Sequence, residues 1–273
     1  MRKEILWAIF AGIAFGLIIA FGVVRINSTL KPKGEITQTT PTPQPNPSGF
    51  KITLDKPENE DVITADSTLV SGLTKPKNTI IISVEEKDYL VSSDDKGFFE
   101  KEIDLISGVN QIRITEPASQ TTEKLLVIYS SAFEEKEGDR LEKAANKPKA
   151  YLGTVTDITD STIQIRTTSS EIRQISVSEK VVYVKTEPAI GDFIVAMGYK
   201  NGNQVLNAQR ILITPPVTEP KITVSMAKGA DVKPTKTTKI YPKASDLKDE
   251  SQTVSVTTEV SGKSYFRTVF VIQ

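Results

Sequence analysis

Gln111-Ile-Arg-Ile-Thr115 sets the fold class of this chain, because its side chains alternate between polar and apolar. Successive side chains of a strand point to opposite faces, so Ile112 and Ile114 share one face while Arg113 points to the other. Short runs of the same kind, rich in Val, Ile and Thr and bounded by turn residues, recur throughout the chain after residue 49. This pattern is typical of sandwiches and barrels and predicts an all-β body.

Residues 49–131 are expected to form an immunoglobulin-like β-sandwich. Turn residues separate the expected strands: Gly97 supplies the positive φ that a tight hairpin needs, and Asn110 can cap its turn with its own side chain. The expected strands are residues 51–54, 68–73, 79–84, 88–92, 98–105, 111–115 and 124–129.

A series of motifs in this region is more specific than the strand pattern. They are Ser71-Gly72, Pro76, Asp95-Lys-Gly97-Phe98, Leu105 and Gly108-Val-Asn110-Gln-Ile112. With these motifs the region resembles the bacterial Ig-like domain found as the second domain of glucodextranase. The resemblance implies a spacer, adhesion or accessory module, and it does not imply a hydrolase.

Strand-like runs return in residues 150–214. They are residues 151–157, 162–167, 172–177, 181–184, 193–199 and 205–212. The motifs Gly153-Thr-Val-Thr-Asp-Ile, Ser161-Thr-Ile-Gln-Ile, Ile190-Gly-Asp-Phe-Ile-Val195 and Asn207-Ala-Gln-Arg-Ile211 make the region similar to a small β-barrel domain of unassigned function, widespread in bacterial exported proteins. We therefore expect a small barrel of the oligonucleotide/oligosaccharide-binding (OB) kind.

Aromatic side chains of this second module are the candidate ligand contacts. Barrels of this kind often bind on one sheet face through aromatic and basic residues. Tyr151, Tyr183 and Tyr199, with Phe193 nearby, could stack on a sugar or a base. The alternative is that these rings pack in the core or across strands, as isolated aromatics on strands commonly do.

Residues 5–24 contain no charged side chain and would span roughly 30 Å as a helix, the thickness of a bilayer core. We expect a membrane-spanning helix that contacts the lipid bilayer, preceded by a cytoplasmic head of residues 1–4 and followed by an extracytoplasmic body at the cell surface. A cleaved signal peptide is the alternative, because Ala20-Phe-Gly22 resembles a cleavage site. Positive charges on both flanks do not decide the orientation; the large polar body after the segment does.

The remaining segments are predicted to be connectors. Residues 25–48 form a Thr/Pro-rich linker, since repeated prolines exclude helix and ladder alike. Residues 132–149 form a short helical connector between the modules. Residues 215–273 form a β-rich extension with a polar loop. The extension either completes the second module, on which we expect its strands to pack, or forms a third small β unit.

Composition excludes several functions. Without His or Cys the chain has no Ser-His or Cys-His nucleophile and no thiolate metal site. Its 34 basic and 34 acidic residues argue against nucleic acid as a partner. Asp157, Asp160, Glu187 and Asp192 suggest no catalytic pair by their spacing. We expect no catalytic residue, cofactor or metal, hence no enzyme.

Two functions remain. The first is a non-enzymatic, membrane-anchored extracytoplasmic protein whose β modules act in cell-surface interaction or envelope structure; the sequence does not identify its protein or polysaccharide partner. The alternative is a binding module for an envelope or extracellular polysaccharide. Exposed aromatic side chains on one face of the molecule would favour the alternative.

Overall fold

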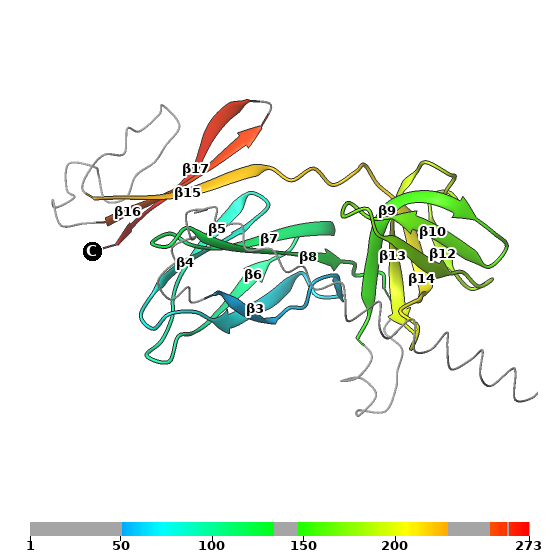
Figure 1. Ribbon diagram of the computed structural model, residues 1–273, viewed down its shortest axis with the longest axis horizontal. Coiled ribbons are helices and arrows are strands. Elements are labelled where there is room, and N and C mark those ends of the chain that lie inside the picture. The colour runs from blue at the N-terminus through cyan, green and yellow to red at the C-terminus, as the bar shows by residue number, and fades with distance from the viewer. Residues whose placement is uncertain (1–50, 134–146, 229–251, 261, 273) are drawn as a thin grey trace, which may run out of the picture. The chain divides into compact units, whose positions relative to one another are not determined.

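The computed structural model describes residues 51–133, 147–228, 252–260 and 262–272, which form an all-β structure (Figure 1). Within these ranges no helix has the length and apolar character that a membrane span requires. The predicted head, membrane helix and linker of residues 1–48 lie outside the described residues. So do residues 134–146 of the predicted helical connector and residues 229–251, which include nearly all of the polar loop.

The first module is a sandwich of two sheets. The smaller sheet has the order β1-β3-β6, and the larger sheet contributes β2-β8-β7-β4-β5 to this module. The strands are β1 (Thr53–Lys56), β2 (Asp61–Ile63), β3 (Ser67–Leu73), β4 (Thr79–Val84), β5 (Lys87–Ser92), β6 (Phe98–Asp104), β7 (Gly108–Glu116) and β8 (Thr121–Tyr129).

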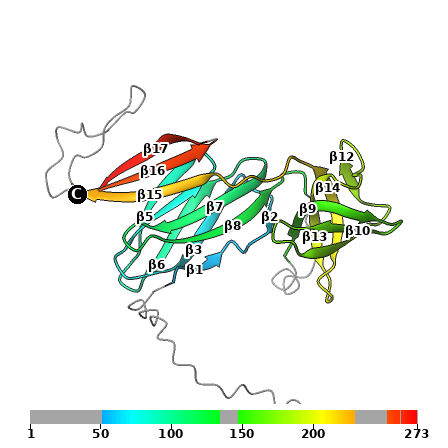
Figure 2. The same cartoon turned by 45° about the horizontal axis from the view of Figure 1, so that its top comes forward.

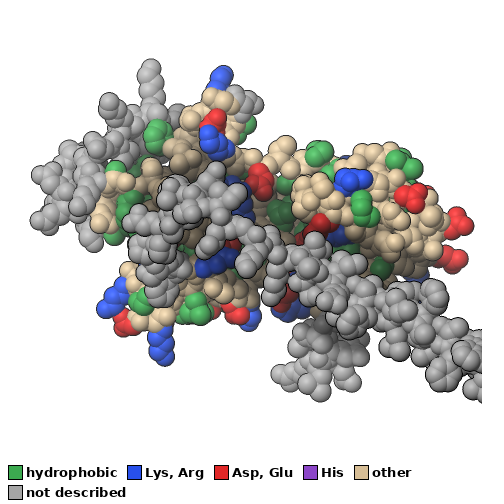
Figure 3. Space-filling model, in the orientation of Figure 1, with side chains coloured by type: hydrophobic (Ala, Val, Ile, Leu, Met, Phe, Trp, Pro, Cys, Tyr) green, Lys and Arg blue, Asp and Glu red, His purple; other side chains and the backbone are tan. Residues whose placement is uncertain are grey.

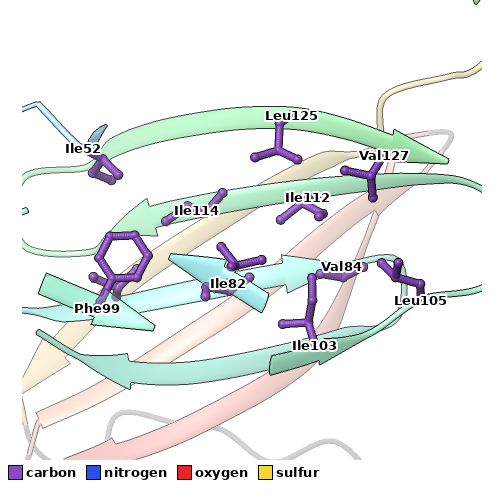
Figure 4. Close-up of a cluster of buried hydrophobic side chains, with 12 residues drawn as sticks. Ile52, Ile82, Val84, Phe99, Ile103, Leu105, Ile112, Ile114, Leu125 and Val127 are labelled. Atoms are coloured by element: carbon purple, nitrogen blue, oxygen red, sulfur yellow. The ribbon is translucent and has the colours of Figure 1, made fainter. Parts of the chain in front are cut away.

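Apolar side chains from the two sheets meet between them (Figure 4). Phe99 and Ile103 come from β6, and Ile112 and Ile114 come from β7; each is at most 1% exposed. Arg113 lies between Ile112 and Ile114 in the sequence and on the opposite face of β7. Its side chain is half-buried and points away from this core. The alternation in the sequence of β7 is therefore confirmed.

Turn chemistry fixes the strand ends. Gly97 has a φ of 86°, as the hairpin before β6 requires. The buried Asn110 side chain accepts a hydrogen bond from the Ile106 N–H at 2.8 Å and donates to the Ile106 carbonyl at 2.7 Å, which confirms its capping role. Gly72 serves a close approach instead, because a Cβ there would lie 2.3 Å from the Thr53 carbonyl oxygen.

The second module is a closed ring of strands. Backbone pairings run β9–β10, β10–β11, β11–β14, β14–β13 and β13–β9, and the β11–β14 pair is parallel. The buried side chains inside include Ile165, Ile175 and Ile194. The strands are β9 (Lys149–Ile158), β10 (Thr162–Arg166), β11 (Ile172–Ser176), β12 (Val182–Val184), β13 (Phe193–Lys200) and β14 (Leu206–Ile213).

The C-terminal extension forms a separate antiparallel sheet of β15 (Lys221–Lys228), β16 (Gln252–Val260) and β17 (Lys263–Ile272). Our expectation that it packs on the second module is wrong: its inner face covers β4 and β5 of the first module (Figures 1 and 2). Val224, Val254 and Val256 bury Ile81 there. The reason is that Ile81 of β4 and its cross-strand neighbour Leu90 of β5 point away from the sandwich core and need cover of their own.

Candidate functional site

A three-residue strand joins the first two modules. β2 pairs with β8 of the first module in parallel and with β9 of the second. The Val62 N–H donates to the Pro148 carbonyl at 3.1 Å, and the Ala150 N–H donates to the Glu60 carbonyl at 2.8 Å. One large sheet therefore runs through both modules.

Apolar packing reinforces this junction. Val62, Ile128 and Phe133 of the first module form one buried cluster with Leu152, Phe193, Val195, Met197 and Tyr199 of the second. Val195 and Met197 are fully buried. Since removing such side chains from water stabilises by roughly 25 cal/mol per Å² of apolar surface, the modules are held as one body.

Charged side chains surround the apolar cluster. The Lys149 ammonium lies 2.7 Å from a carboxylate oxygen of Glu58 and 2.7 Å from one of Asp61. Hydrogen bonds from Lys149 and Lys147 hold the pKa of Glu58 below its ordinary value. Burial lowers the pKa of Lys149, but the bonds to Asp61 and Glu58 outweigh it, and the pKa lies above its ordinary value.

Glu60 extends the charged network into the second module. Its carboxylate lies 2.5 Å from Nη1 of Arg173 and 4.0 Å from Nζ of Lys200. Both cations also lie over the ring of Tyr151, with 4.8 Å from the Arg173 Cζ and 5.0 Å from the Lys200 Nζ to the ring centroid. Burial lowers the pKa of Arg173, but the hydrogen bonds and ion pairs with Glu60 and Glu171 raise it more, so the pKa lies above its ordinary value.

A polar pocket of about 400 Å³ opens beside these side chains on the second module. Tyr151, Arg173 and Lys200 line it together with Ile172 and Gln174 of β11 and with residues 203–205 of the turn between β13 and β14. The Tyr151 hydroxyl donates to the Gln204 carbonyl at 2.5 Å, which fixes the turn against the strand. The pocket therefore has a rigid wall made of Tyr151 and its two cations.

The pocket is suited to a neutral polar ligand. Its cations are already paired with Glu60 and, for Arg173, with Glu171. The side-chain amides of Gln174, Asn203 and Gln204 are exposed and make no hydrogen bond within the described part of the chain. A side-chain amide is neutral and both donates and accepts hydrogen bonds. These groups can therefore bind the hydroxyl groups of an uncharged ligand.

The three predicted tyrosines lie in different places. Tyr151 is 2% exposed and belongs to the core of the ring, and Tyr199 is 9% exposed, with its ring centroid 6.2 Å from that of Phe133 in the junction cluster. Tyr183 is half-buried on β12 and packs against the ring core. Of the three, the structure brings only Tyr151 to the pocket, where its ring face is covered by cations.

Sequence reasoning missed the polar lining. Arg173 and Gln174 belong to no motif, and Asn203 and Gln204 read as ordinary turn residues beside Gly202. Their convergence depends on the parallel pairing of β11 with β14, which brings β11 beside the start of β14 at the end of the turn. A sequence pattern carries no signal for that contact.

Acidic side chains are engaged in turns rather than in a cluster. Asp94 Oδ1 accepts hydrogen bonds from the backbone N–H groups of Lys96 and Phe98, and Asp192 Oδ2 accepts one from Ala189. Among the described residues, no three acidic side chains are grouped so as to hold a metal ion. On the face shown in Figure 3, basic and acidic side chains are interspersed.

Comparison with known proteins adds no relative: no family model matches the chain, and no curated protein matches it significantly.

Proposed function

We propose that this chain is a non-enzymatic, membrane-anchored protein whose β body lies outside the cytoplasm and serves cell-surface interaction or envelope structure. The observation that carries the proposal is the junction, in which a shared sheet, a shared apolar cluster and the Lys149 and Arg173 ion pairs join two modules. Such a body can present the surfaces of both modules together to a partner. The uncharged residues 5–24 support the anchor.

Strand order supports the finer identity of each module. In the first, β1 pairs within the small sheet while β2 pairs in parallel with the last strand, β8, of the large one. All other pairings within the two sheets of this module are antiparallel, as in an immunoglobulin-like sandwich. In the second, five strands close with one parallel pair, as in a small Greek-key barrel of the OB kind.

Membrane topology tests the first part of the proposal. The full chain, tagged at its N-terminus, is expressed in a bacterium, and protease is added to spheroplasts. We expect the chain in the membrane fraction, with the body digested and the tag protected. Leu17→Arg with Ile18→Arg is the matched control, since each Arg at a helix centre costs about 2.5–3.5 kcal/mol and should release the chain. A body protected in intact spheroplasts would contradict the proposal.

Polysaccharide binding is a second candidate function, and the amides around the pocket favour it. Gln174, Asn203 and Gln204 offer donors and acceptors beside the exposed apolar side chain of Ile172. Such a mixture fits the hydroxyls and C–H faces of an uncharged sugar. The candidate stacking of a ligand on Tyr151 has no part in this version, because the ring of Tyr151 is buried.

Calorimetric titration of the full chain in detergent with neutral and acidic glycan fragments tests this candidate. Gln174→Ala and Asn203→Ala should each weaken binding of a neutral glycan about 2- to 10-fold, the equivalent of one lost hydrogen bond. Asn207→Ala, an exposed amide outside the pocket lining, is the matched control and should change nothing. Equal binding by all three variants would exclude the pocket.

A further inference from the structure

The turn between β13 and β14 contains the dipeptide Asn201-Gly202, which occurs once in the chain. Both residues are exposed. Oδ1 of Asn201 accepts hydrogen bonds from two backbone N–H groups, those of Asn203 at 2.9 Å and Val205 at 3.0 Å. The N–H of Gly202 makes no hydrogen bond within the described part of the chain.

These contacts favour an intramolecular attack of the Gly202 nitrogen on the Asn201 side chain. Two N–H donors on Oδ1 draw electrons from Cγ and would stabilise the negative charge that develops on Oδ1 during attack, as an oxyanion hole does. The nitrogen of Gly202 is the adjacent nucleophile. Because its N–H donates no hydrogen bond within the described part of the chain, base can remove its proton. Gly202 carries no side chain to block the approach, and the space where a Cβ would lie is open.

We propose that Asn201 is a site of spontaneous deamidation. The Gly202 nitrogen forms a bond to Cγ of Asn201 and loses its proton, and the side-chain nitrogen leaves as ammonia, which gives a five-membered succinimide. Water then adds to one of the two ring carbonyls and opens the ring to aspartate or isoaspartate. The step consumes one water, releases one ammonia and needs no oxidant or reductant.

The product alters the polar pocket, since Asn201 lies in the chain between Lys200 and Asn203, which both line it. Either product adds one negative charge near Lys200 and the amides of Asn203 and Gln204. Aspartate retains an oxygen that can accept from Asn203 and Val205. Isoaspartate lengthens the backbone by one methylene and displaces the turn, so it breaks the bond from the Tyr151 hydroxyl to the Gln204 carbonyl.

Peptide mapping by mass spectrometry after incubation of the full chain in mildly alkaline buffer tests the proposal. We expect a gain of about 1 Da, located at Asn201 and divided between aspartate and isoaspartate. Gly202→Ala should slow the conversion without unfolding the turn. Asn203, which is equally exposed but precedes Gln204, is the internal control and should stay unmodified over the same time.

A synthetic peptide of residues 198–206 separates the contribution of the structure from that of the dipeptide. If the two N–H donors promote the attack, the folded chain converts at least as fast as the free peptide. A folded chain that converts more slowly than the peptide, or not at all, would overturn the proposal, since the turn would then protect Asn201. Neither outcome depends on whether the pocket binds a glycan.

Discussion

The first module is covered at two places, and the two interfaces are built from different interactions. At the junction with the second module, backbone hydrogen bonds continue one sheet through β2. At the outer face of β4 and β5, the C-terminal strands form a sheet of their own and attach through side chains. The difference teaches that the junction combines a continued backbone ladder with apolar and ionic side-chain contacts, whereas the C-terminal interface depends on contacts made by side chains.

A buried ion pair is central to that second interface. The side chain of Asp88 is fully buried, and its carboxylate lies 3.2 Å from Nη2 of Arg267, whose side chain is 10% exposed. Ser83 and Thr268 each donate a hydroxyl hydrogen bond of 2.6 Å to the same carboxylate. The register of β16 and β17 shifts beside Arg267, and this irregularity allows Arg267 and Thr268 to reach Asp88 together.

Asp88→Ala should have the largest effect on stability. Removing one partner of a buried pair leaves an uncompensated charge, so the free energy of unfolding should fall by about 3–5 kcal/mol. The C-terminal sheet should become sensitive to protease while the ring stays protected. Denaturant unfolding and limited proteolysis with mass mapping measure the two effects.

Two variants sharpen that prediction. Asp104→Ala removes the exposed partner of Lys87 and should leave both readouts unchanged. Asp88→Leu with Arg267→Met replaces the pair by apolar groups of similar size and should recover most of the lost stability. Proteolysis of the C-terminal sheet that is identical in Asp88→Ala and the parent chain would contradict the role of the pair.

Ile128→Ala tests the junction. Ile128 is fully buried in the cluster that both modules share, and the substitution should cost about 2–5 kcal/mol. We expect the single unfolding transition of the first two modules to divide into two. Ile165→Ala, which makes a similar cavity inside the ring, is the matched control and should lower stability without uncoupling the modules. Coincident transitions in Ile128→Ala would show that the backbone ladder suffices.

The smallest expected effect is a loss of stability at acidic pH. Because the pKa of Glu58 is lowered by folding, its ion pairs stabilise the junction above the ordinary pKa and are lost as pH falls through the folded pKa. The Glu58 side chain is 54% exposed, so Glu58→Gln should lower stability at neutral pH by under about 1 kcal/mol. The difference from the parent chain should vanish in acid. Thermal unfolding across pH measures it, and a difference that persists at low pH would argue for packing instead.

Much of the strand pattern could be read from the sequence because alternation is a local property. β4 has the predicted bounds, and β3, β7 and β8 differ from their predicted ranges only at their ends. The sequence analysis does not predict β2, since three residues are too few to show a period. The predicted position of the C-terminal sheet, on the second module, is wrong. The apolar run Ile80-Ile81-Ile82 indicates a strand that is buried on both faces.

The sequence by itself determined where most of the strands lie, where turns need Gly97 and Asn110, and which chemistries the absence of His and Cys excludes. Only the tertiary structure decided which modules touch, which tyrosine reaches the pocket, and that Arg173, Lys200 and Glu60 meet there. The physical reason is range. Side-chain alternation and turn geometry act between neighbours in the chain, whereas Glu60 and Arg173 become partners only after β2 and the closed ring have formed.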